Sequence, residues 1–195
     1  MDHYTIRFDN KTIIKARGTV LACYPELHLM DLQFSDNAAS RTVLVSALAS
    51  NGEALLLDGT SLRLHHLDAF MLDLGSVQAR EDYLGFFCEF VRSDEGPFSI
   101  VESVEAIPFA YQDAQAEFLE QSVGPSAIAA IQTETDDTFG QRAYVLHGMG
   151  LSEADFKTTR TGRIDILRDK TVFNDLTIRR RDYDGPFRTV LGPTR

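Results

Sequence analysis

Histidine side chains are the first candidates for chemistry in this chain, because imidazole can carry a proton or ligate a metal near neutral pH. His65 and His66 are adjacent, and Asp68 follows two residues later. On a strand, neighbouring side chains point to opposite faces, so these two imidazoles could not ligate one metal together. His66 and Asp68 would share a face, where a carboxylate can orient an imidazole. The alternative is two half-exposed residues of an ordinary strand.

His147 and the aromatic residues that follow Asp82 are further candidates for a ligand pocket. His147 opens the stretch HGMGLS, whose glycines indicate a bulge or the end of a strand more readily than a phosphate loop. Tyr83 and Phe87 belong to an aromatic stripe with helical spacing, which is typical of a pocket wall or of a helix face packed on a sheet. The candidate pocket residues are therefore His66, Asp68, Tyr83, Phe87 and His147.

Short catalytic and cofactor motifs are absent from the sequence. It contains neither of the two glycine-rich nucleotide motifs, G-x-G-x-x-G and G-x-x-x-x-G-K-[ST], nor the nucleophile elbow G-x-S-x-G. A Ser-His-acid site could still form in space, because its members are far apart in sequence. Cys23 and Cys88 lie in apolar surroundings and outside zinc-ligand spacing, which favours two small buried side chains. We predict no metal and no cofactor, and we lean against an enzyme.

The basic charge of an otherwise acidic chain is concentrated at its end. The net charge is -10, which disfavours binding to nucleic acid or to anionic membranes. Residues 156–195, however, hold ten Lys and Arg against five Asp. Arg179, Arg180 and Arg181 are consecutive and could bind a partner; alternatively they end an edge strand in solvent or pair with the chain's own acidic residues. Phe187, in the second of two acid-Gly-Pro-Phe turns, would fix where these arginines point.

Hydrophobic periodicity predicts the elements that must position these residues. Alternation predicts a hairpin within 3–18, a strand at 27–34 and a hairpin around Asp58-Gly59 within 53–67. The stretch 37–52 fits a helix or a buried strand. Helical spacing predicts helices within 76–91, with Ser76 as N-cap, and within 110–124, and a short helix at 126–134. Further strands are expected at 97–109, 142–150, 153–160, 162–169 and 170–180.

This order of elements predicts an α+β fold with a mainly antiparallel, meander sheet and helices packed on one face. We expect one compact domain over 1–195; the alternative is a β-rich subdomain, 1–75, and a subdomain of helix plus C-terminal meander, 76–195. The N-terminus lacks the pattern of a signal peptide, and no apolar run approaches a bilayer span. A cytoplasmic location is the resulting expectation.

Two functional hypotheses follow from these patterns. The leading one is a non-catalytic interaction or regulatory domain that acts through protein-protein contacts or homodimerisation, because charge is distributed unevenly and catalytic motifs are missing. Its basic end, with Arg179, Arg180, Arg181 and Phe187, would contact the partner. The alternative is a small-molecule-binding protein or enzyme with a pocket between a helix and a curved sheet. Nucleic acid is a disfavoured partner, and a membrane is not expected.

Overall fold

The structure is a computed structural model that describes residues 11–36, 41–51, 53–121, 124–133, 135 and 137–189. Side chains are described for these residues except 11, 36, 41, 68–70 and 121. The hairpin predicted within 3–18 therefore lies partly outside the described residues, and its second half is a strand. Among the helices that are described, none combines the length and the apolar character needed to cross a membrane.

The first sheet joins the N-terminal strands to the C-terminal end of the chain. Its path is β1-β2-β3-β13-β12, and β4 also pairs with β3. All of its described pairings are antiparallel. The stretch 37–52, which fitted a helix or a strand, contains β3, because its β-branched residues pack into the sheet. The strands are β1 (Lys11–Val20), β2 (His28–Asp36), β3 (Arg41–Ser50), β4 (Glu53–Leu56), β12 (Tyr183–Asp184) and β13 (Phe187–Thr189).

The second sheet is built on a three-strand meander, with path β11-β10-β9-β7 and β8 pairing with β9. Its strands are β7 (Ser99–Ile100), β8 (Ala129–Ile131), β9 (Thr138–His147), β10 (Gly150–Thr159) and β11 (Ile164–Phe173). The predicted turn at Asp169-Lys170 is wrong, because both residues pair with β10 inside the continuous strand β11. The turn at Thr161-Gly162 is confirmed, and Gly162 adopts a φ of +81° there.

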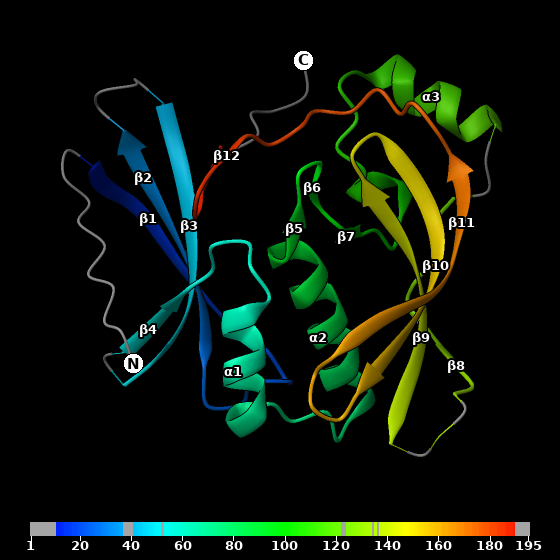
Figure 1. The fold of residues 1–195 in the computed structure, drawn as a ribbon. Coiled ribbons are helices and arrows are strands. Elements are labelled where there is room, and N and C mark those ends of the chain that lie inside the picture. Colours follow the sequence, from blue (N-terminus) through cyan, green and yellow to red (C-terminus); the bar gives the residue numbers. More distant parts are fainter. Residues whose placement is uncertain are drawn as a thin grey trace.

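The three α-helices are α1 (Leu62–Met71), α2 (Val77–Phe90) and α3 (Gln112–Gln121), and a short 3-10 helix, η1, covers Val104–Ala106. The second begins as predicted, because the Ser76 hydroxyl accepts a hydrogen bond from the backbone N–H of Ala79 at 3.0 Å. Figure 1 shows α1 and α2 between the two sheets. Leu84 and Cys88 of α2 pack on β9 and β10, whereas Tyr83 and Phe86 join the cluster that contains α1.

Three further local predictions are wrong, and tertiary packing explains the clearest of them. The hairpin expected around Asp58-Gly59 is instead β4, a turn and the helix α1. Leu64, Leu67 and Met71 repeat at helical spacing, and this face packs in the α2 cluster, which a strand would not allow. The expected short helix at 126–134 holds the strand β8, and the strand expected at 97–109 is reduced to short β-pairs and η1.

The α+β class with mainly antiparallel sheet is confirmed. After β11 the chain crosses back to the first sheet, where β13 pairs with β3 (Figure 1). This crossing connects the predicted segments 1–75 and 76–195, whose status as subdomains stays a prediction. It also brings Arg181 against Glu89, and Arg188 over the ring of Phe90, at the end of α2.

Candidate functional site

A polar cleft of about 630 Å³ lies where three segments that are distant in sequence meet. They are the turn before α1, the hairpin β5 (Arg92–Ser93) to β6 (Gly96–Pro97), and the crossing segment that leads into β12. The cleft is lined by Asp58, Gly59, Thr60, Arg92, Ser93, Asp94, Glu95, Gly96, Arg180, Arg181, Asp182 and Tyr183. Most of these side chains are ionisable, so the cleft suits a small charged ligand rather than an apolar one.

Arg92 joins the three segments. One of its terminal guanidinium nitrogens donates hydrogen bonds to the backbone carbonyls of Asp58, at 2.6 Å, and Gly185, at 2.8 Å. The guanidinium also lies 4.2 Å from the centre of the Tyr183 ring. Burial lowers the pKa of Arg92, while Tyr183 and Asp58 act in the opposite direction. Gly59 has a φ of +96°, and a Cβ there would overlap the guanidinium.

The two acid-Gly-Pro-Phe stretches both form hairpins, but with different registers. In the first, Ser93 pairs with Gly96, so the two-residue loop precedes the glycine. In the second, Asp184 pairs with Phe187, so Gly185 and Pro186 themselves form the loop. Both glycines have positive φ, +114° for Gly96 and +54° for Gly185. Phe187 packs on the Phe34, Val43 and Val45 cluster and anchors the second hairpin to the first sheet.

The three consecutive arginines contact groups of this chain. Nε of Arg179 donates to the carbonyl of Phe109 at 3.2 Å, and Arg181 pairs with Glu89 at 2.6 Å. Arg180 donates to the carbonyl of Glu95 at 3.1 Å. Arg180 and Arg181 line the cleft, and Arg181 is tied to the last turn of α2 through its ion pair.

His147 lies beside this cleft, with its imidazole hydrogen-bonded to Ser93 and close to the carboxylate of Glu95. Nε2 of His147 is 2.7 Å from the hydroxyl of Ser93, and Nδ1 is 3.7 Å from a carboxylate oxygen of Glu95. The imidazole stacks on Phe98, with ring centres 4.1 Å apart and planes at 11°. The carboxylate reaches this position over Gly148, where a Cβ would lie 2.9 Å from Oε2. The arrangement suits proton transfer from the hydroxyl to the imidazole.

Tyr183 lines the cleft, but its hydroxyl oxygen is buried and has no hydrogen-bond partner among the described residues. Burial raises the pKa of this phenol; nearby Glu89 raises it further, and Arg181, Arg188 and Arg92 act against these effects. A buried hydroxyl without a hydrogen-bond partner is destabilising.

The predicted pocket residues lie mostly elsewhere. His66 is exposed on α1, and the side chain of Asp68 lies outside the described residues. Tyr83 is fully buried and donates to the carbonyl of Gly162 at 2.6 Å. Phe87 is half-buried against Tyr83 and His65. Of the four predicted pocket residues whose side chains are described, only His147 contacts residues that line the cleft.

Sequence reasoning missed Arg92 and Ser93. Their position in the sequence could have indicated them. They directly follow the apolar stripe of α2 and precede a glycine turn, so they lie where the helix ends and a loop begins, and loops often carry functional residues. It also missed Glu95, because its contact with His147 joins residues more than fifty positions apart.

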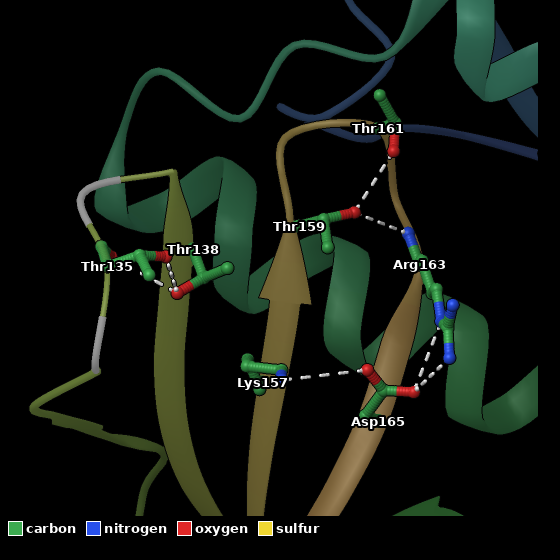
Figure 2. A network of polar contacts seen from close by, with 7 residues as sticks. All are labelled: Thr135, Thr138, Lys157, Thr159, Thr161, Arg163 and Asp165. Atoms are coloured by element: carbon green, nitrogen blue, oxygen red, sulfur yellow. Dashed lines mark hydrogen bonds and ion pairs between the residues drawn. The ribbon is translucent and has the colours of Figure 1, made fainter.

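A second polar network lies at the far end of the meander and serves the fold. Figure 2 shows Thr159 bonded to Thr161 and to the backbone N–H of Arg163, while Asp165 accepts from Arg163 and approaches Lys157. These contacts close the β10–β11 turn. Within the described residues, no group of three or more His, Cys, Asp or Glu side chains could hold a metal ion.

Comparisons of this chain with protein families, with curated proteins and with solved structures found no match. The geometry of the cleft and its residues therefore carries the functional argument.

Proposed function

We propose that the protein binds a small zwitterionic ligand, of the amino-acid or dipeptide type, in the cleft between the 58–60 turn, the β5–β6 hairpin and residues 180–183. The observation that carries the proposal is that exposed charged side chains of both signs line one concave surface without an ion-pair partner among the described residues. Arg180 makes a single hydrogen bond within the described chain, to a carbonyl, and no ion pair. The carboxylates of Asp94 and Asp182, described on the same cleft, have no partner among described residues.

A ligand with a carboxylate and an ammonium would satisfy both signs. The Arg180 guanidinium can bind a carboxylate through two parallel hydrogen bonds, and Asp182 or Asp94 can accept from an ammonium. Asp58 is already engaged, because Thr60 donates to it through its hydroxyl at 2.8 Å and its backbone N–H at 3.1 Å. Arg92, held in place by two carbonyls, adds positive potential without needing to reorganise.

A binding screen with three ligand classes tests the proposal. Free amino acids and dipeptides are compared with dicarboxylates such as succinate and with diamines such as putrescine, by calorimetry and thermal shift. We expect binding by zwitterions, weakened about tenfold or more by Arg180→Gln and by Asp182→Asn, since each removes a charged hydrogen bond. Arg168→Gln, on the exposed side of β11, is the matched control and should leave binding unchanged. Equal affinity of Arg180→Gln and Arg168→Gln, or no binding by zwitterions, contradicts the proposal.

Self-association is the second candidate function, and it continues the leading sequence hypothesis of an interaction domain or homodimer. The edge strand β11 carries two adjacent apolar residues, Ile166 and Leu167, that are 52% and 53% exposed. The register between β10 and β11 shifts at Leu167, which forms a β-bulge. Bulges in an edge strand discourage pairing with the edge of another sheet. The cleft therefore ranks first. Sedimentation of the wild type and of Leu167→Lys tests the second candidate: a concentration-dependent dimer lost in the variant supports it, and a monomer at all concentrations refutes it.

A further inference from the structure

We propose that Ser93 is an activated nucleophile that cleaves small carboxylic esters, with His147 as its general base and Glu95 as a positioning residue. The inference deepens the proposed function, since Ser93 and Glu95 line the same cleft. It rests on the geometry around His147 and does not require that the zwitterionic ligand be identified correctly.

The contacts of His147 select the tautomer that a general base needs. Glu95, 3.7 Å from Nδ1, favours the proton on that nitrogen. Nε2 can then accept from the Ser93 hydroxyl at 2.7 Å, a much shorter contact than the 3.5 Å from the same hydroxyl to the carbonyl of Gly96. The stacked Phe98 ring limits rotation of the imidazole. The base is therefore oriented on both sides, by a carboxylate and by an aromatic face.

The turn that carries Ser93 also holds its hydroxyl oxygen in place. The backbone N–H of Glu95 donates to that oxygen at 3.0 Å. Arg180 donates to the carbonyl of Glu95 and so places a cationic group beside this turn, where it would stabilise negative charge on a reacting carbonyl oxygen. Ser99, by contrast, donates its hydroxyl to Glu89 and has no imidazole partner among the described residues.

The chemistry balances with water as the only co-reactant. Oγ of Ser93 attacks the ester carbonyl carbon, its proton passes to Nε2 of His147, and the carbonyl electron pair moves to oxygen. Collapse of the tetrahedral intermediate breaks the bond to the alcohol oxygen, which leaves with the proton from Nε2. Water, deprotonated by the same imidazole, then attacks the acyl-Ser93 ester, and the carboxylic acid departs as Ser93 is regenerated.

Covalent labelling of the wild-type protein tests the nucleophile directly. A fluorophosphonate probe should add once per chain, on the peptide that contains Ser93, and p-nitrophenyl acetate should be hydrolysed with the same pH dependence as labelling. Ser93→Ala should abolish both, whereas the matched variant Ser99→Ala should retain them. His147→Gln should slow labelling about 100-fold or more, the usual contribution of a general base.

The positioning role of Glu95 is tested by the labelling rate, compared with the melting temperature, because a purely structural role would change stability as well. Glu95→Gln should slow labelling while Glu95→Asp restores part of the rate, with melting temperatures of both variants equal to that of the wild type. Wild-type protein that stays unlabelled beside a labelled control hydrolase overturns the proposal, whatever the variants do. Labelling at a serine other than Ser93 overturns it as well. Binding of a zwitterionic ligand without labelling of Ser93 would refute the role of Ser93 as a nucleophile but would still support the proposed binding function.

Discussion

Removing the Arg92 side chain should destabilise the fold more than removing an exposed arginine such as Arg168, because Arg92 contacts all three segments of the cleft. Two hydrogen bonds from its guanidinium to carbonyls are lost, at 2.6 and 2.8 Å. Such bonds to a charged group contribute ~1.5–3 kcal/mol when buried, and about 1 kcal/mol each is appropriate for this partly exposed pair. Stacking on Tyr183 adds ~0.5–1 kcal/mol. The total for Arg92→Ala is ~2.5–3 kcal/mol.

Urea denaturation monitored by circular dichroism measures this loss. With a denaturant slope of about 2 kcal/mol per molar, the midpoint should fall by ~1–2 M. The control is Arg168→Ala, whose guanidinium is half exposed and lies 4.0 Å from both Glu153 and Asp155. Exposed pairs of this kind contribute ~0–1 kcal/mol, so its midpoint should barely move. Equal midpoints for the two variants would refute the role given to Arg92.

A double-mutant cycle with Gly59 isolates the close approach. Gly59→Ala should be costly in the wild type, because the new methyl group overlaps the guanidinium and the backbone has positive φ. In the Arg92→Ala background only the backbone strain remains, so the second substitution should cost less. Additive losses would show that the two residues do not interact.

Three further predictions concern the core and the outer sheet. Tyr83→Phe leaves the carbonyl of Gly162 without its hydrogen-bond partner. Because such a bond contributes ~1–1.5 kcal/mol, the melting temperature should fall by ~2–6 °C. An unchanged melting temperature would show that the bond does not stabilise the fold. Burial, with a smaller effect of neighbouring Glu89, raises the pKa of the Cys88 thiol to about 12. Alkylation of this thiol at pH 8 should therefore occur only as the protein unfolds in urea. Fast alkylation of Cys88 in the native protein would contradict this. The hydrogen bond from Arg142 lowers the pKa of Asp155, so this carboxylate stabilises the fold above ~pH 4 and the benefit is lost as the pH falls below that value. The stability difference between wild type and Asp155→Asn should therefore shrink on acidification, and a constant difference would argue against the ion pair.

The strongly periodic elements could be predicted from sequence, whereas their boundaries depended on packing. The aromatic stripe and Ser76 sufficed for α2, because its cap and its apolar face are both local. The stretch 53–67 was misread because Asp58-Gly59 is a good hairpin turn in isolation. Only the packing of Leu64 against α2 selects a helix there. In the same way, Asp169-Lys170 resembles a turn until β10 pairs with both residues.

The candidate site was less accessible than the fold. His147 was chosen from its residue type, but Ser93 and Glu95, its partners, became visible only when β9 was placed beside the β5–β6 hairpin. Tyr83 and Phe87 have the spacing of a pocket wall and of a core face alike, and the structure gives Tyr83 a buried position in the core.

By itself, the sequence determined the α+β class, the strand alternation of the C-terminal meander, the helix α2 and the basic character of the chain's end. These properties arise from short-range periodicity and capping, which act within a few residues. Only the tertiary structure decided that the basic end returns to the first sheet, that Arg92 joins three segments, and that Ser93 meets His147. Each of these contacts joins residues separated by dozens of positions, and the free energy that selects them comes from packing that local sequence does not encode.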